Sequence, residues 1–293
     1  MDIIGSPTLP SLAYKLFKNK FKKHKIEMTT AEDYINYKEA YRGGAVDVYR
    51  THGFNLNCYD VNSLYPSVMR ANKYPVGPSE YFKGSFYPAQ GALKDIFGII
   101  KCNITAPDLY APILLTKTIE NKIVAPVGSW TGWYCSEELK LAEKYGYKVE
   151  VLEGYHWEKR ANLFSNYVST LYDLRLTYPK SDPRNMICKL LMNSLYGKFG
   201  MSPKMIEYSF LSLVPYGVGR EIEAEITSSE DWADMQQLGD YLMIGIEVTK
   251  NSIKKLKESQ ENKEQYKLLE ISTPIAIFTT AYARMHTRTW GRV

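Results

Sequence analysis

Hydrophobic residues recur every three or four positions in several parts of the chain, which is the spacing of one helical face. Signals for helix ends bound some of these stretches. Thr30 can cap a helix that ends before Gly43, and Pro274 follows a Ser-Thr pair that can cap another. The last of these helices is expected to pack beneath a sheet. The pattern predicts helices over residues 12–25, 30–41, 63–69, 136–144 and 163–178, from 185 into 197, and from 274 onward.

Other stretches alternate or form short apolar runs, as strands do. Residues 54–59 alternate toward Asp60, so we expect Asp60 at a strand end, directly before the helix that opens at Ser63. Helices and strands in mixed order predict an α+β fold. Strands are predicted over residues 45–50, 54–59, 97–105, 111–115, 147–152 and 241–248.

Composition narrows the class of protein only modestly. The chain has 293 residues, 45% hydrophobic, and a formal net charge of +5, which suits a polyanionic partner without requiring one. Its 4 cysteines form no C-x-x-C pair, so neither a zinc site nor a disulfide framework is indicated. Without a secretory leader or a long apolar run, we expect a soluble protein that is not secreted, in a compartment that the sequence leaves open, such as a host cytoplasm or a mitochondrion.

Asp60 is the first candidate for chemistry. A carboxylate that faces the free N–H groups of a helix N-terminus can hold a divalent cation with a phosphate beside it. A lone Asp at a strand end is more often a helix cap, so its neighbours must decide between these interpretations.

Those neighbours resemble a known family. Asp60-Val-Asn-Ser-Leu-Tyr-Pro-Ser67 is similar to the first polymerase motif of family B DNA polymerases, D-x-x-S-L-Y-P-S. Lys189-Leu-Leu-Met-Asn-Ser-Leu-Tyr-Gly197 is similar to the second, K-x-x-x-N-S-x-Y-G, and Thr280-Ala-Tyr-Ala-Arg284 is like the helix that leads into the third. The spacing of these motifs resembles the protein-primed branch of phages and linear plasmids. Template-directed DNA synthesis, with Mg²⁺ as cofactor, is what the resemblance implies.

The resemblance assigns roles to individual residues. Asp60 is the expected catalytic residue, and with Val61 it is expected to hold metal. Tyr65 is expected to exclude ribonucleotides, because a ring under C2′ leaves no room for a 2′-hydroxyl. The expected nucleotide-binding residues are Val61, Leu64, Tyr65, Arg175, Lys189, Asn193 and Tyr196.

A second element concerns DNA. Tyr41-Arg-Gly-Gly44 is similar to the Y-x-G-G element that binds the template strand in the same family, and it offers a stacking ring and a charge. Lysines between positions 15 and 25 could contact phosphates, although a solvated basic face is the commoner arrangement. Arg175, Lys180, Arg184 and Lys189 could likewise converge on a triphosphate or be ordinary surface charges. The expected DNA-binding residues are Tyr41, Arg42, Gly43, Gly44, Ser194 and Gly197.

The sequence also departs from the family. The third motif, Y-x-D-T-D-S, has no match, so we expect a partial chain whose second metal-binding carboxylate is absent, without exonuclease domain or thumb. Residues 221–234 are acidic but unlike that motif, and residues 250–267 form a charged tract, an exposed helix or a mobile insertion. The expected layout is 1–44 basic segment with Y-x-G-G, 45–78 palm, 79–160 insertion resembling the terminal-protein region, 161–200 fingers, 201–270 second insertion and 271–293 palm helix.

Three hypotheses follow. The first is a polymerase part that works with DNA template and primer, deoxynucleoside triphosphates and a terminal protein. The second is a non-catalytic DNA-binding remnant, or half of a split polymerase whose second chain supplies the third motif. The third is an unrelated α+β protein, which requires two specific motifs to coincide in order by chance.

Overall fold

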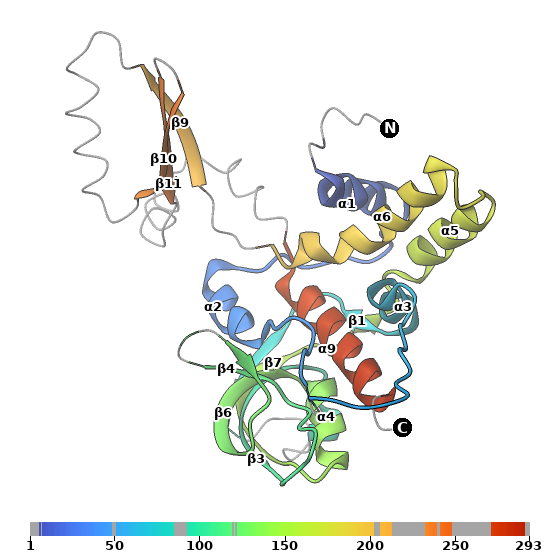
Figure 1. The fold of residues 1–293 in the computed structure, drawn as a ribbon. Helices are drawn as coiled ribbons and strands as arrows, with labels where there is room; N and C mark the ends of the chain where they lie inside the picture. Colours follow the sequence, from blue (N-terminus) through green and yellow to red (C-terminus); the bar gives the residue numbers. More distant parts are fainter. Residues whose placement is uncertain are drawn as a thin grey trace. The chain divides into compact units, whose positions relative to one another are not determined.

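The computed structural model confirms an α+β fold. The chain divides into two compact units, residues 1–201 together with 271–293, and residues 202–270. Figure 1 shows the helices and strands of each. The structure describes residues 6, 8–48, 51–84, 93–118, 120, 122–201, 206–212, 232–238, 241–247 and 271–290.

A four-stranded antiparallel sheet forms one part of the first unit. Its order is β2-β7-β3-β6, built from Glu80–Lys83, Lys148–His156, Gly98–Ala106 and Gly128–Cys135. Helix α4, Ser136–Lys144, follows β6 directly and packs on the sheet through Leu139 and Ala142. The structure therefore confirms the predicted strands over 97–105 and 147–152 and gives the predicted helix over 136–144 the same bounds.

The strand predicted over residues 111–115 is wrong. Ile113, Leu114 and Leu115 are buried in the core of the sheet region, but their backbone is held by side chains. The Ile113 N–H donates to the Tyr147 hydroxyl at 3.0 Å, and the Leu115 carbonyl accepts from Tyr134 at 2.8 Å. The short apolar run thus indicates here that these residues are buried, but it does not indicate that they pair as a strand.

Helices form the other part of the first unit. Helix α1 (Leu9–Lys20) ends five residues earlier than predicted, and α2 (Ala31–Ala40) starts as predicted. The Thr30 hydroxyl accepts from the Asp33 N–H at 3.1 Å and donates to its carboxylate at 2.7 Å. The core contains edge-to-face aromatic pairs contributed by α1, α5 and α6, among them Phe17 with Tyr167 and with Phe199.

Helix α9, Thr273–Trp290, crosses the centre of this unit (Figure 1). Residues 271–284 are all buried. The helix contacts β1 (Tyr74–Pro75) and β6, but most of its neighbours are the helices α2, α3, α4 and α6. The expected helix is confirmed. It shares one buried cluster with residues of the four-stranded sheet, among them Ile99, Trp133 and Tyr155, although most of its neighbours are helices.

The predicted helical hairpin is confirmed. Helix α5 spans Ser165–Leu176, and α6 spans Pro183–Phe199. Asp182 caps α6 by accepting from the Arg184 N–H at 2.8 Å. The Asn185 side chain donates to the carbonyls of Arg175 and Tyr178 at 3.0 Å each, which fixes the end of α5 against the start of α6.

Short segments complete the first unit. The structure forms α3 over Leu64–Ala71, a 3₁₀ turn η1 over Leu93–Asp95, the pair β4 (Thr116–Lys117) and β5 (Ile123–Val124), and β8 (Arg160–Ala161), which pairs with β1. No helix within the described residues is long and apolar enough to cross a membrane.

Two predicted strands before Asp60 are wrong. Residues 45–48 and 54–59 are extended or irregular, and they pair with no other described strand. Their apolar side chains are exposed: Val46 by 95%, Phe54 by 92% and Leu56 by 79%. The alternation is in the sequence, but a strand also needs a partner, and the described residues supply none.

The second unit contains an antiparallel sheet of order β10-β11-β9. Its strands are Trp232–Leu238, Tyr241–Glu247 and Ile206–Ser212. The strand predicted over 241–248 is confirmed as β11. The charged tract 250–267, and residues 221–231 of the acidic stretch, lie outside the described residues.

Candidate functional site

The first motif surrounds the start of α3. Ser63 precedes the helix in a left-handed conformation, with φ 52° and ψ 52°, and its side chain makes no capping hydrogen bond. This conformation is uncommon for a residue with a Cβ. It turns the chain sharply between Val61 and Leu64. Asp60 thus lies in an exposed, irregular segment, which corrects the prediction that it ends a strand.

The first and second motifs meet through two tyrosine rings. Tyr65, in the first turn of α3, stacks on Tyr196 of α6 with ring centroids 4.3 Å apart and planes at 17°. Burial, and then the neighbouring Tyr65, raise the pKa of Tyr196 to about 12. Residues 131 positions apart in sequence thereby form one half-buried aromatic surface.

The Y-x-G-G element reaches the same place. A Cβ added at Gly44 would lie 3.6 Å from the Tyr65 hydroxyl oxygen. A Cβ at Gly200, directly after α6, would lie 2.5 Å from the Tyr41 hydroxyl oxygen. The Tyr41 ring therefore occupies the space that a side chain at position 200 would need. Burial, and then Tyr65, raise the pKa of Tyr41. The structure therefore gathers Tyr41 and Gly44 around the start of α3 and the end of α6.

Arg42 does not offer its charge to a ligand, which corrects its expected role. Its guanidinium is buried, donates to the Trp133 carbonyl at 2.8 Å and lies 4.2 Å from the centroid of the Tyr134 ring. Burial lowers the pKa of the Arg42 guanidinium. Since both partners belong to β6, Arg42 anchors the Y-x-G-G element to the sheet.

The second motif presents one face of α6. Lys189, Asn193 and Tyr196 are spaced i, i+4 and i+7, so they lie along the same side of the helix. Lys189 is exposed and Asn193 is half-buried. Because Tyr196 stacks on Tyr65, this face is the one that meets the start of α3. The sequence-predicted nucleotide residues on α6 therefore share a side with the first motif.

Two further predicted residues of α6 are less distinctive. The Ser194 hydroxyl donates to the Leu190 carbonyl at 2.6 Å, a local helical contact. A Cβ at Gly197 would meet nothing within 4 Å, so the backbone there is open to an approaching group.

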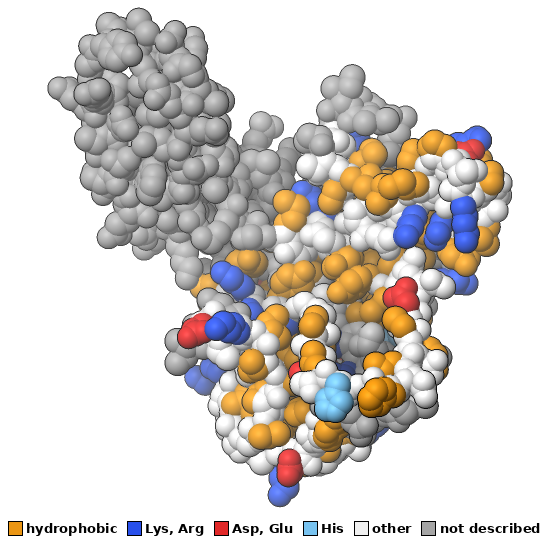
Figure 2. Space-filling view, viewed as in Figure 1, with side chains coloured by type: hydrophobic (Ala, Val, Ile, Leu, Met, Phe, Trp, Pro, Cys, Tyr) orange, Lys and Arg blue, Asp and Glu red, His pale blue; other side chains and the backbone are white. Residues whose placement is uncertain are grey.

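The basic residues of the hairpin are used differently from one another. The Arg175 Nε donates to the Asn185 side chain at 3.1 Å, one turn before Lys189 on the same face of α6. Arg184 pairs with Asp182 at 2.7 Å and lies over the Tyr178 ring at the hairpin tip. Figure 2 shows basic side chains gathered over the α5 and α6 region among exposed hydrophobic ones. The ion pair keeps Arg184 at the tip, whereas Lys189 remains exposed.

The donors for a metal ion are few. No group of three or more His, Cys, Asp or Glu side chains within the described residues could hold one. The Asp60 carboxylate forms no hydrogen bond or ion pair with any described residue. Mg²⁺ prefers oxygen ligands and binds through one or two carboxylates together with waters and substrate phosphates. The Asp60 carboxylate and the Val61 carbonyl fit that chemistry.

Sequence reasoning gave no role to one buried ion pair. Glu138 of α4 and Arg284 of α9 pair at 2.7 Å, with side chains 5% and 2% exposed. One feature of the sequence could have indicated this pair. Glu138 is next to Leu139 in a predicted amphipathic helix, and a carboxylate that is buried with the apolar residues needs a charged partner.

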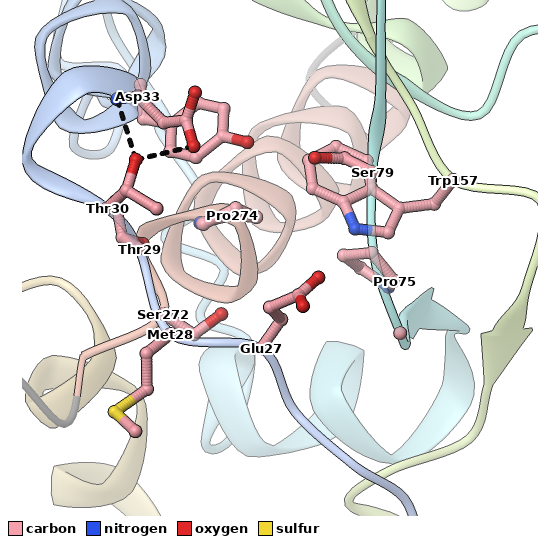
Figure 3. A pocket seen from close by; sticks show the side chains of 12 residues that line it. Glu27, Met28, Thr29, Thr30, Asp33, Pro75, Ser79, Trp157, Ser272 and Pro274 are labelled. Carbon is pink, nitrogen blue, oxygen red and sulfur yellow. Dashed lines mark hydrogen bonds between the residues drawn. The ribbon is translucent and has the colours of Figure 1, made fainter.

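A cavity of about 180 Å³ lies elsewhere, between the starts of α2 and α9 (Figure 3). Trp157 and Ser79 lie on one side of it, and Thr30 and Asp33, joined by a hydrogen bond, on another. No residue of the two polymerase motifs lines this cavity, so the candidate site is the surface around Tyr65 and Tyr196.

Comparison with known proteins decides the family. The sequence profile described as DNA polymerase type B, organellar and viral, matches residues 1–289. The chain belongs to this family. The matched residues include both motifs, around Asp60 and around Lys189.

Relatives of this type B polymerase chain occur in fungi. A probable DNA polymerase of Neurospora intermedia is 33% identical over 295 residues, which cover 98% of the chain and 28% of the relative. A probable DNA polymerase of Ascobolus immersus is 40% identical over 217 residues, which cover 72% of the chain and 18% of the relative. The chain thus spans less than a third of the length of these two relatives.

A solved structure shares the fold of this family member. Phi29 DNA polymerase complexed with primer-template DNA and incoming nucleotide substrates aligns with a TM-score of 0.62 at 22% identity. The alignment covers 97% of the chain and 45% of the phi29 polymerase. This likeness supports the α+β fold of the chain.

Proposed function

We propose that the chain forms the nucleotide-selecting part of a protein-primed DNA polymerase, which carries out template-directed DNA synthesis from deoxynucleoside triphosphates. The observation that carries this proposal is the stack of Tyr65 on Tyr196. It joins the first and second motifs into one surface, with Lys189 and Asn193 on the same helical face. Membership of the type B family supports it.

The roles of the residues follow from their places. Lys189, exposed on α6, is the cation for the triphosphate, and Asn193 and Tyr196 form the nucleotide wall. Arg175, held beside Asn185, adds charge one turn away. The backbone at Leu64, at the free N-terminus of α3, faces the same phosphates, because helix N-termini attract anions.

Tyr65 selects the sugar. Its ring is fixed on one side by Tyr196 and neighbours Gly44 on another, so it has little freedom to move away from a 2′-hydroxyl. Tyr41, Gly43 and Gly44 are assigned to the template strand, and Ser194 and Gly197 to DNA near the end of α6. Arg42 supports this element from inside the fold.

Asp60 is the proposed metal-binding catalytic residue, with the Val61 carbonyl beside it. Bound Mg²⁺ would neutralise phosphate charge and stabilise the oxygens of an in-line displacement at phosphorus. A two-metal site needs a further carboxylate, which a second chain or another part of the polymerase would supply. The sheet β2-β7-β3-β6, within the insertion over residues 79–160, is the proposed contact for a terminal protein.

Primer extension tests this function. The purified chain, together with the part of the polymerase that supplies the further carboxylate, would be assayed with Mg²⁺ and deoxynucleotides. The variants are Asp60→Ala and the matched control Asp47→Ala, which removes another exposed carboxylate from the same segment. We expect Asp60→Ala to lower extension about 1000-fold or more, since a metal contributes several kcal/mol to the transition state. Asp47→Ala should extend normally.

Equal activity of the Asp60 and Asp47 variants would overturn the role of Asp60. Salt-sensitive binding of primer-template DNA without extension would instead support the second hypothesis, a DNA-binding part of a split polymerase. A chain that neither extends nor binds DNA would contradict both.

A further inference from the structure

A buried ion pair connects two elements that no motif links. Arg284 Nε donates to Glu138 Oε1 at 2.7 Å, and Nη2 donates to Oε2 at 2.8 Å. Glu138 comes from α4 and is 4% exposed; Arg284 comes from α9 and is 2% exposed. Such a two-bond contact fixes the plane of the guanidinium as well as its place.

The remaining nitrogen of Arg284 points at the Y-x-G-G element. Nη1 donates to the Arg42 carbonyl at 2.7 Å and to the Gly43 carbonyl at 2.8 Å. The plane that Glu138 fixes therefore decides where these two backbone carbonyls lie. Burial alone would lower the pKa of Arg284, yet its interaction with Glu138 raises it, so the guanidinium stays charged.

The Gly43–Gly44 backbone has few other restraints. A Cβ at Gly43 would meet nothing within 4 Å, so no neighbouring atom confines it from that side. Glycine also has the greatest backbone freedom of any residue. The two hydrogen bonds from Arg284, together with the anchor that the Arg42 side chain makes on β6, therefore hold this element in place.

The element in turn neighbours the sugar-selecting ring. Gly44 lies beside the Tyr65 hydroxyl, and Tyr65 stacks on Tyr196. A shift of Gly44 removes a boundary of the Tyr65 ring, and small misplacements of a positioning group have large effects on a reaction.

A role in stability alone would not require this arrangement. Buried ion pairs are often no more stabilising than well-packed hydrophobic residues, because both charges must leave water. Hydrophobic side chains could fill the same space, but they could not bind the carbonyls of Arg42 and Gly43.

We infer that Glu138 is a positioning residue of the nucleotide site, which acts through Arg284 on the Arg42–Gly44 backbone and so on Tyr65. This inference rests on the proposed function. It places a determinant of sugar selectivity in α4, within the insertion over residues 79–160 and outside the polymerase motifs.

The test compares two neighbouring carboxylates. Glu138→Gln keeps the shape of the side chain but removes its charge and one of its two acceptor oxygens. Glu137→Gln is the matched control, because Glu137 is on the same helix and pairs with Lys140 at 2.6 Å, with both side chains 23% exposed and no contact to Arg284 among the described hydrogen bonds. The readout is the ratio of kcat/KM for a deoxynucleotide to that for the matching ribonucleotide, in which the fraction of folded enzyme cancels.

We expect Glu138→Gln to lower this ratio about tenfold, with the larger change in KM, and Glu137→Gln to leave it unchanged. A second measurement needs no activity. Amide hydrogen exchange should be measured at the end of α2, residues 37–41, and in α3, residues 67–71, which hold the hydrogen-bonded amides on either side of the element. It should be faster in Glu138→Gln than in the wild type or Glu137→Gln. If Glu138→Gln does not fold, Arg284→Lys keeps the positive charge but loses the planar contact, and the same exchange pattern is expected.

The outcomes separate the two proposals. A wild-type chain that extends primers, with an unchanged ratio and unchanged exchange in Glu138→Gln, overturns the inference and leaves the proposed function standing. A wild-type chain that neither extends nor binds DNA overturns the proposed function. In that case faster exchange over residues 37–41 and 67–71 would still show that Glu138 positions the element, and unchanged exchange would overturn this as well.

Discussion

The two sides of the candidate site differ in how they are held. The aromatic side, defined by Tyr41, Tyr65 and Tyr196, is packed between helices, and a contact within the fold restrains each ring. The acidic side, residues 45–48 and 51–60, carries Asp60 and is irregular and mostly exposed, with Phe54 92% and Tyr59 90% accessible. Figure 2 shows hydrophobic side chains on the face that the acidic side crosses.

This difference has a physical cause. The aromatic side lies where α3 and α6 pack, close to α2 and α9, so folding of the first unit positions it. The acidic side has the alternation of a strand but no strand partner among the described residues. Helix packing thus fixes the ring proposed to select the sugar, whereas the carboxylate proposed to bind metal lies on an unpaired segment and depends on further contacts.

The sharpest test of the comparison is one of stability, with two phenylalanines. Phe278 of α9 is fully buried, and Phe54 of the acidic side is 92% exposed. We expect Phe278→Ala to lower the free energy of unfolding by about 3–5 kcal/mol, because it opens a cavity in the core. Phe54→Ala should change it by no more than about 0.5 kcal/mol. Urea unfolding of both variants measures this. Similar losses in the two variants would show that the acidic side is packed in solution.

The second test concerns the charge on α6. Lys189→Ala should weaken the binding of a deoxynucleoside triphosphate about 10- to 100-fold, as expected for a lost hydrogen bond to a charged group. Lys148→Ala, on an exposed strand position of the sheet, is the control and should bind normally. Equilibrium titration with the nucleotide measures both. If Lys189→Ala binds as well as Lys148→Ala, the assignment of this face of α6 to the triphosphate is wrong.

The third test reduces the aromatic side to one ring. Tyr65→Val should relax the exclusion of ribonucleotides about tenfold, because the ring that blocks the 2′-hydroxyl is gone. Tyr65→Phe keeps the ring on Tyr196 and should discriminate like the wild type. Competition between deoxynucleotides and ribonucleotides during primer extension measures the ratio. Unchanged discrimination in Tyr65→Val would remove Tyr65 from sugar selection.

Helix spacing and capping residues in the sequence correctly predicted the helices that are stabilised by contacts between residues close together in the chain. The helix over 136–144, the helical hairpin and the cap at Thr30 all follow from spacing and capping residues close together in sequence. The strands before Asp60 were mispredicted because pairing depends on distant residues. The same limit explains residues 111–115, whose burial resembles that of a strand while side chains bind their backbone.

The sequence predicted the candidate site residues that belong to motifs. It could not predict the partners of side chains that become buried in the fold, such as Arg42. The motifs name Tyr65 and Tyr196, whose rings stack between α3 and α6, and Lys189, which lies on the same face of α6 as Tyr196. They could not show that Arg42 turns inward to Trp133, since a charged residue beside two glycines is equally consistent with an exposed loop. Glu138 lies outside every motif, and only the three-dimensional contact with Arg284 reveals it.

The place of α9 has a consequence for how the chain is made. This helix is the last described element, yet it lies at the centre of the first unit, and Thr29 and Thr273 exchange contacts across 244 positions of sequence. During synthesis, α1 to α6 must leave the ribosome and wait several seconds, while the second unit is translated, before their central helix arrives. The nascent chain therefore exposes an incomplete hydrophobic core during that interval. Chaperones can bind this exposed surface, and the chain can aggregate through it.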